Sequence, residues 1–235
     1  MTRGLRLIRQ SRVTEAAVAG IAVIVALSAL FLVMRYPALP ELLPVRFGPR
    51  GTPIGWQFKT FTRVMMPVFV QVALTLTLGA IGALLLSRSH GTHDEAAADV
   101  RAASAAAECV ALMALIWVAF QGYAAVTLVE MWERQQGGLG RVYTFVGIGA
   151  ALLTIVVAAR ARVQVGRPAS RPFVGEHWRL GQLYCNSGDP ALFVPTRDGG
   201  HWTLNFGRPV AVALIALILG IGVIGPTVIL GLLLR

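Results

Sequence analysis

The stretch YPALPELLPVRFGPRGTPIGWQFK, residues 36–59, separates two hydrophobic segments that are each long enough to cross a bilayer. Its five prolines fix φ and remove backbone N–H donors, and its three glycines permit conformations that other residues avoid. We therefore expect no long helix here. The stretch predicts a structured loop with turns, such as residues 48–51, and one short extended piece at residues 45–47.

The rest of the chain has the composition of a polytopic membrane protein. Of its 235 residues, 56% are hydrophobic and only 14% are charged. A helix that crosses a bilayer needs about 20 mostly apolar residues. Five segments satisfy this requirement, at residues 16–35, 64–86, 105–129, 142–160 and 210–234. The sequence therefore predicts an all-α polytopic membrane protein with five transmembrane helices.

The formal net charge of +10 is carried mainly by arginines that flank these segments. A nucleic-acid-binding protein would gather such charge on one face of a soluble domain, so we predict the lipid bilayer as a partner and no nucleic acid. Arginine and lysine are more frequent in the N-terminal segment and the loops 87–104 and 161–209 than in the alternate loops. By the positive-inside rule, this pattern predicts a cytoplasmic N-terminus and an external C-terminus.

A second polar region, residues 177–209, precedes the last hydrophobic segment and has the pattern of a small β-meander. Trp202, Leu204 and Phe206 alternate with polar residues, which predicts a strand with one buried face. Turn-forming sequences separate three expected strands, at residues 182–185, 192–195 and 201–206. The predicted division of the chain is a four-helix membrane region at 1–161, a cytoplasmic loop at 162–209 and a final helix at 210–235.

Groups that would carry catalysis or hold a metal are scarce. Glu108 and Glu130 are separated by roughly 33 Å along a helix, so we expect them near opposite membrane faces and not at the centre. Two sets of residues have suitable ligand chemistry. In the first, His90, His93, Asp94 and Glu95, the residues Gly91 and Thr92 leave the His-x-x-His spacing without the support of an obvious helix. The spacing of the second, His177, Cys185, Asp189 and His201, matches no common metal-binding motif. We predict no catalytic residue, no metal and no cofactor, in a protein that is not an enzyme.

Residues 36–59 resemble the SdpI-like membrane family (domain of unknown function 1648). The family signature runs Pro-x-His-Phe-Asn-x-x-Gly-x-x-Asp-x-x-x-x-Lys, and its scaffold positions agree here at Pro44, Phe47, Gly51 and Lys59. The polar positions differ, because the chain has Arg46, Gly48 and Ile54 where the family has histidine, asparagine and aspartate.

Residues 177–209 are similar to a second small family, the domain of unknown function 5808. Its pattern has a Gly-x-x-Tyr-x-Asn-x-x-Asp-Pro-x-x-x-Val-Pro core and then Gly-x-x-x-x-Asn-Phe-x-x-Pro. The agreeing positions are Gly181, Tyr184, Asn186, Asp189, Pro190, Val194, Pro195, Gly200, Asn205, Phe206 and Pro209.

The first resemblance implies a function, because SdpI-like proteins include bacterial membrane proteins that give immunity to a secreted antimicrobial peptide and signal to a repressor. We therefore expect a protein of the bacterial inner membrane that binds a peptide or protein partner through its loops. The alternative is an accessory subunit of a membrane transport complex, and the sequence does not set the oligomeric state. The expected partner-binding residues are Arg46, Phe47, Arg50, Gly51, Trp56, Lys59, Tyr184, Asn186, Asp189, Trp202 and Asn205.

Overall fold

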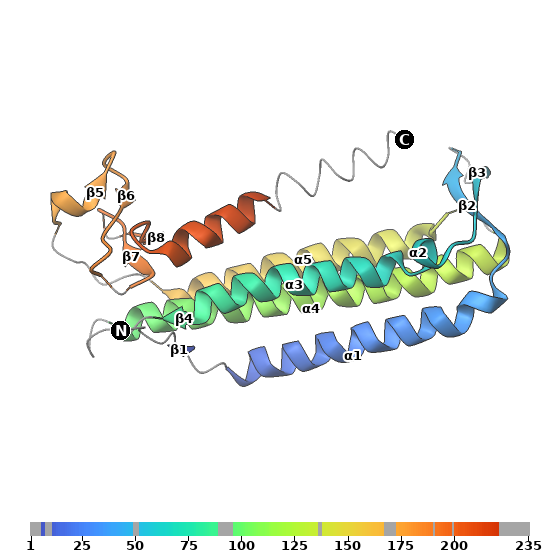
Figure 1. The fold of residues 1–235 in the computed structure, drawn as a ribbon, viewed down its shortest axis with the longest axis horizontal. Coiled ribbons are helices and arrows are strands. Elements are labelled where there is room, and N and C mark those ends of the chain that lie inside the picture. Colours follow the sequence, from blue (N-terminus) through green and yellow to red (C-terminus); the bar gives the residue numbers. More distant parts are fainter. Residues whose placement is uncertain are drawn as a thin grey trace. The chain divides into compact units, whose positions relative to one another are not determined.

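The computed structural model describes residues 6–7, 11–48, 52–88, 96–135, 138–166, 173–189, 191–198 and 200–220. Over these residues the chain is mostly helical, with short antiparallel strand pairs (Figure 1). The chain forms two compact units, one of residues 13–79 with 111–159 and the other of residues 1–12, 80–110 and 160–235. We describe each unit by itself, and the boundaries predicted after residues 161 and 209 stay a prediction.

Among the described residues, four helices contain stretches that are long and apolar enough to cross a membrane: α1 (Arg12–Arg35), α3 (Met66–Leu86), α4 (Ala96–Arg134) and α5 (Gly140–Val165). They correspond to the first four predicted spans, so the expectation of a multi-pass membrane protein is confirmed at this level. The fifth span is described only as a shorter apolar helix, Pro209–Gly220, and residues 221–235 lie outside the described part of the chain. The fifth span therefore stays a prediction.

Helix α4 is much longer than the span of residues 105–129 that the sequence predicts. Its 39 residues extend for about 58 Å at 1.5 Å per residue, whereas the hydrocarbon core of a bilayer is about 30 Å thick. The expected loop 87–104 is thus helical from Ala96 onward. Alanine has the highest helix propensity, and the Ala-rich sequence of residues 96–107 continues the helix beyond its most apolar part.

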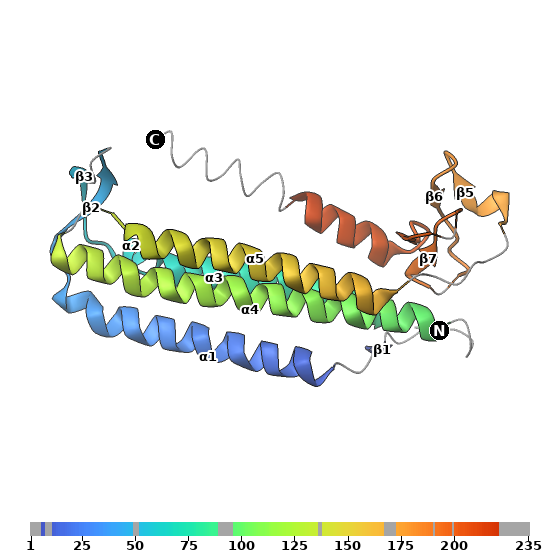
Figure 2. The ribbon, with the colours of Figure 1, turned by 180° about the vertical axis from the view of Figure 1, so that it is seen from behind.

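Residues 36–59 form a β-hairpin with two six-residue strands, whereas the sequence predicted only residues 45–47 to be extended. After a short 3₁₀ helix, η1 (Tyr36–Ala38), strand β2 (Leu42–Phe47) pairs in an antiparallel manner with β3 (Pro53–Phe58). A two-stranded ribbon tolerates its prolines because each strand bonds along one edge only. Strands β2 and β3 run crosswise to the long axes of the helices that flank the hairpin (Figure 1, Figure 2).

The hairpin rests on the main apolar core of the same unit. Leu43 of β2 has no exposed surface and joins a buried cluster with residues of four helices, α1, α2 (Phe61–Val64), α3 and α4. Thr60 caps the start of helix α2, because its side chain accepts a hydrogen bond from the backbone N–H of Arg63 at 3.3 Å. The buried members of the cluster are Leu32, Leu39, Leu43, Val64, Met65, Val68, Ala125, Val129, Met131 and Trp132.

The region of residues 173–208, which we call the C-terminal module, differs from the expected three-stranded meander. It has four strands in two separate antiparallel pairs, β5 (Trp178–Arg179) with β6 (Leu183–Tyr184) and β7 (Phe193–Pro195) with β8 (Trp202–Leu204). The additional strand arises because Leu180 and Gly181 adopt positive φ values of 50° and 73°, which reverse the chain after Arg179. The expected strands at 182–185, 192–195 and 201–206 contain β6, β7 and β8.

Charged and polar contacts join the helices in the unit of residues 1–12, 80–110 and 160–235. The carboxylate of Glu108 on α4 accepts hydrogen bonds from Arg160 of α5 at 2.9 Å and from the hydroxyl of Ser11 at 2.8 Å. A short antiparallel pair also joins β1 (Arg6–Leu7) to β4 (Ser87–Arg88). Glu108 is therefore neutralised by a specific partner, as a buried carboxylate requires.

Candidate functional site

Lys59 closes the base of the hairpin. Its Nζ donates a hydrogen bond to the carbonyl oxygen of Leu39 at 2.9 Å and forms an ion pair with Glu41 at 3.1 Å. The same atom lies 5.2 Å from the ring centroid of Tyr36, and the backbone N–H of Lys59 donates to the carbonyl of Glu41 at 2.7 Å. The side chain is only 9% exposed, so its ammonium group bonds to groups at the base of the hairpin itself.

Arg46 and Gly55 are cross-strand neighbours at the middle of the hairpin. A Cβ atom at position 55 would lie 2.9 Å from Cβ of Arg46, a distance that real Cβ atoms essentially never show. Position 55 therefore needs glycine because the Arg46 side chain crosses it, while Arg46 itself is exposed. Phe47 is partly buried and packs against the core. Arg50 and Gly51 lie outside the described residues.

The hairpin and the start of α2 expose an apolar surface that we call the hairpin patch: Leu42, Ile54, Trp56, Phe58 and Phe61. Trp56 and Phe58 lie two residues apart in β3, so they share a face of the strand, and Leu42 is the cross-strand partner of Phe58. These five side chains are between 46% and 72% exposed. The patch thus contains one expected site residue, Trp56, among residues that the sequence-based list omitted.

Asn205 is the polar centre of the C-terminal module and has no exposed surface. Its Nδ2 donates to the carbonyl oxygens of Asn186, Asp189 and Ala191 at 2.8, 3.3 and 3.2 Å. Its Oδ1 accepts from the backbone N–H groups of Asn186 and Gly207, both at 3.0 Å. The alternating pattern predicts Asn205 on the exposed face of its strand, and this prediction was wrong. Strand β8 ends at Leu204, and the next side chain turns inward to hold the loop.

The other expected site residues of the module surround this loop. The hydroxyl of Tyr184 donates to Asp189 Oδ2 at 3.0 Å, and Nδ2 of Asn186 donates to that hydroxyl at 3.4 Å. The remaining carboxylate oxygen of Asp189 accepts from the N–H of Ala191 at 2.9 Å, and Oδ1 of Asn186 accepts from the N–H of Gly188 at 2.9 Å. The structure therefore brings Tyr184, Asn186, Asp189 and Asn205 together as an internal hydrogen-bond network.

Trp202 connects the module to the end of α5. Its indole N–H donates to the carbonyl oxygen of Gly166 at 3.2 Å. Gly166 follows the last residue of α5 and has a φ of 64°, the left-handed conformation that commonly ends a helix. Trp202 thus satisfies one of the carbonyl groups that a helix end leaves without an intrahelical partner.

A small pocket opens on the module beside this network. It has a volume of about 70 Å³. Trp178 and Tyr184 meet edge to face with ring centroids 5.3 Å apart, and the guanidinium of Arg197 lies 4.7 Å from the ring centroid of Phe173. The lining residues, which we call the aromatic pocket, are Phe173, Val174, His177, Trp178, Tyr184, Val194, Pro195, Thr196 and Arg197. The sequence analysis missed this pocket, for which three rings within six residues, at 173, 177 and 178, were an available signal.

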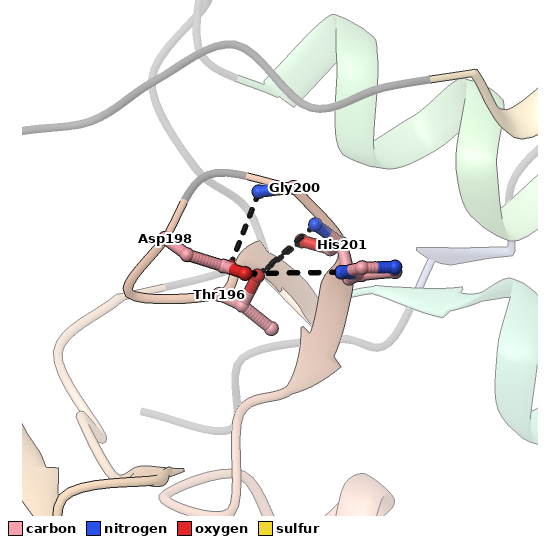
Figure 3. A network of polar contacts seen from close by, with 4 residues as sticks. All are labelled: Thr196, Asp198, Gly200 and His201. Atoms are coloured by element: carbon pink, nitrogen blue, oxygen red, sulfur yellow. Dashed lines mark hydrogen bonds and ion pairs between the residues drawn. The ribbon is translucent and has the colours of Figure 1, made fainter.

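The turn between β7 and β8 is fixed by polar contacts (Figure 3). The hydroxyl of Thr196 donates to Asp198, whose carboxylate also accepts from the N–H of Gly200 at 3.2 Å. The N–H of His201 donates to the Thr196 hydroxyl oxygen at 3.0 Å. The hydrogen bond from Thr196, followed by that from Gly200, lowers the pKa of the Asp198 carboxyl below its ordinary value. Asp198 therefore stays ionised at the tip of this turn.

Gln71 of α3 is the main buried polar side chain between the apolar helices of the first unit. Its Nε2 donates to Ser28 Oγ of α1 at 3.0 Å and to the carbonyl oxygen of Val118 of α4 at 2.9 Å. Its Oε1 is buried and has no hydrogen-bond partner among the described residues. These contacts join three helices, in the way that interhelical polar groups do in membranes.

Within the described part of the chain, no group of three or more His, Cys, Asp and Glu side chains is arranged to hold a metal ion. His177, Cys185, Asp189 and His201 therefore do not form the metal site that their chemistry allowed. His90, His93, Asp94 and Glu95 lie outside the described residues.

The family model of the Domain of unknown function (DUF1648) matches residues 23–70. The match begins within α1, includes the whole hairpin and ends within α3, so it covers less than half of the chain. It confirms the resemblance of residues 36–59 to the domain of unknown function 1648, whereas the SdpI-like assignment stays a prediction. No curated protein and no solved structure matches the chain. The resemblance of residues 177–209 to the second family stays a prediction.

Proposed function

We propose that this protein is a non-enzymatic protein of the bacterial inner membrane that binds a peptide or protein partner outside the bilayer, as SdpI-type immunity and signalling proteins do. Four apolar helices and the match to the domain of unknown function support the membrane part of the proposal. The N-terminus and the C-terminal module would be cytoplasmic, as the distribution of arginines favours. The module would then be available to a cytoplasmic partner such as a repressor.

The aromatic pocket is the observation that carries this proposal. Trp, Tyr and Arg are the side chains that most often dominate the binding energy at protein interfaces, and the pocket contains one of each. The polar groups of the neighbouring network, such as those of Asn205 and Asp189, are hydrogen-bonded within the module. A partner would therefore gain affinity from the rings of Trp178 and Tyr184 and from Arg197.

A sensitivity assay tests the immunity function. A strain that lacks the gene is exposed to the antimicrobial peptides encoded beside it, and is complemented with the wild type, Trp178→Ala, Arg197→Gln or Leu180→Ala. Leu180 is 91% exposed and lies outside the pocket, so it is the matched control. We expect the wild type and Leu180→Ala to restore tolerance, and both pocket variants to restore less. Unchanged tolerance of the deletion strain to every such peptide would exclude immunity.

A second candidate function, an accessory subunit of a membrane transport complex, is favoured by α5. This helix is the least buried of the four apolar helices, and large side chains such as Phe145 and Leu152 are more than half exposed. Gly149 has open space around it, which would let a helix of another subunit approach closely. Copurification of the protein with transporter subunits encoded nearby, lost in Gly149→Leu, would support this function instead.

A further inference from the structure

A second cavity adjoins the aromatic pocket on the C-terminal module. It has a volume of about 690 Å³ and is lined by residues of the β5–β6 turn and of the β7–β8 turn. Both cavities share three lining residues, Trp178, Thr196 and Arg197, so they lie side by side on the module. The further lining residues of this second cavity, which we call the polar cleft, are Gly181, Gln182, Asp198 and His201.

The aromatic pocket is the more selective of the two cavities because it is small. Its volume of about 70 Å³ is about half of the roughly 150 Å³ of a cavity that holds benzene. An aromatic side chain is therefore too large for it, whereas a small apolar side chain fits. Trp178 and Tyr184 form two of its walls, and their rings meet at 70°. Aromatic walls favour proline, because proline-rich peptides are already extended and lose little entropy when they bind.

Arg197 supplies the charge at this pocket. It is the only Arg, Lys, Asp or Glu among the described residues that line the aromatic pocket. Its guanidinium lies 4.7 Å from the ring centroid of Phe173, and within the described part of the chain it forms no ion pair with a carboxylate. The contact with the ring holds the guanidinium in place, and the paired N–H groups of arginine match the two oxygens of a carboxylate.

Asp198 lines the polar cleft, but it does not cancel the charge of Arg197 at the pocket. Its carboxylate accepts hydrogen bonds from the hydroxyl of Thr196 and from the N–H of Gly200 (Figure 3). One of its oxygens also lies 4.0 Å from Nδ1 of His201. The carboxylate of Asp198 is therefore bonded within its own turn, and the guanidinium of Arg197 stays available to a ligand.

We infer that the partner of the C-terminal module is an extended peptide segment, which places a proline in the aromatic pocket and an acidic side chain on Arg197. The remainder of the segment lies in the polar cleft, where the amide of Gln182 can hydrogen-bond to a peptide backbone. An acidic side chain is the electrostatic complement of Arg197, whereas a basic one would be repelled. This inference rests on the proposed function, because it specifies the partner that the aromatic pocket binds.

Selection of peptides by the full-length protein tests the inference. The protein is immobilised in detergent micelles and exposed to a random peptide library displayed on phage, with empty micelles as the background. The same selection is made with Arg197→Glu and with Arg179→Glu. Arg179 is exposed and lines neither cavity, so Arg179→Glu is the matched control for a change of charge on the module.

We expect the wild type and Arg179→Glu to enrich peptides that contain a proline with an acidic residue next to it or one position away. Arg197→Glu should keep the preference for proline and replace the acidic preference by one for lysine or arginine. A selected peptide is then synthesised with its acidic residue changed to the corresponding amide. This change should weaken binding to the wild type about tenfold and should leave binding to Arg197→Gln unchanged.

The outcomes separate this inference from the proposed function. Enriched peptides without proline, whose binding is lost in Trp178→Ala, would overturn the inference and leave a partner at the aromatic pocket. An acidic preference that persists in Arg197→Glu would overturn the pairing with Arg197 and also leave that partner in place. No enrichment over empty micelles would overturn the inference together with the aromatic pocket as a peptide-binding site.

Discussion

The Nζ atom of Lys59 lies 2.9 Å from the carbonyl oxygen of Leu39, and this contact ties the end of the hairpin to its beginning. Leu39 is only 3% exposed, so its carbonyl lies at the edge of the apolar core. The lysine that agrees with the family signature is therefore a structural residue of the hairpin in this chain. Its role explains why a charged side chain lies largely buried beside apolar residues.

Replacing Lys59 should destabilise the hairpin more than replacing its ionic partner. Lys59→Met leaves the Leu39 carbonyl without this donor, a change that costs about 1–3 kcal/mol for a buried group. Glu41 is 80% exposed, so Glu41→Gln should cost less than about 1 kcal/mol. Hydrogen exchange of the β2 amides measures both effects. Equal exchange rates in the two variants would show that the ion pair, and not the carbonyl contact, holds the base.

Asn205 should be essential for the order of the C-terminal module. Asn205→Ala removes the acceptor for the Asn186 and Gly207 amides and the donor for three carbonyl groups. Each buried group left without a partner costs about 1–3 kcal/mol. We expect faster exchange of the Asn186 and Gly207 amides and faster proteolysis of the module. Ser187→Ala, at an exposed position of the same loop, should leave both measurements at the wild-type value.

Gly207 should tolerate no larger residue. A Cβ atom there would lie 2.6 Å from both the N and C atoms of the Asn186 backbone, which cannot move aside as a flexible side chain would. We expect Gly207→Ala to disrupt the loop as severely as the loss of Asn205. Gly175→Ala is the control, because its Cβ would meet Phe173 at an ordinary 3.6 Å. Thermal unfolding followed by tryptophan fluorescence distinguishes the two variants, and equal midpoints would contradict the steric argument.

Gln71→Leu should be neutral or stabilising, although it removes two interhelical hydrogen bonds. Such bonds contribute only about 0.6 kcal/mol on average in membranes. Against this, the substitution removes the buried Oε1 atom, which has no partner among the described residues and costs about 1–3 kcal/mol. Unfolding in mixed detergent micelles measures the balance. Gln71→Glu should destabilise strongly, because it buries a carboxylate between apolar helices.

Acidification should loosen the turn between β7 and β8. The pKa of Asp198 is lowered in the folded chain, so its stabilising contribution is fully present above the pKa of an unfolded aspartate. The contribution is lost as pH falls through the lowered, folded value. The protection factors of the Gly200 and His201 amides, which are corrected for the slower intrinsic exchange at acid pH, should therefore fall as the pH is lowered. In Asp198→Asn the carboxylate contribution is absent at every pH, so this acid dependence should disappear.

The sequence by itself determined the membrane character of the chain and most of its helices. Long apolar segments have few stable alternatives to a spanning helix, because a bilayer offers no hydrogen-bond partners to an exposed backbone. Proline and glycine in residues 36–59 also predicted the interruption between α1 and α3. The same local chemistry located the expected strands of the C-terminal module, since turns depend on a few neighbouring residues.

Only the tertiary structure decided what the polar residues of both regions do. Alternation along a strand predicted an exposed Asn205, but the side chain is buried because four backbone groups of residues 186–191 and the N–H of Gly207 converge on it. The pairing of β2 with β3, and with it the hairpin, depended on contacts between residues up to sixteen apart, Leu42 and Phe58. The aromatic pocket likewise joins Phe173 to Arg197. Such contacts depend on how separate segments pack, which no local pattern of residues records.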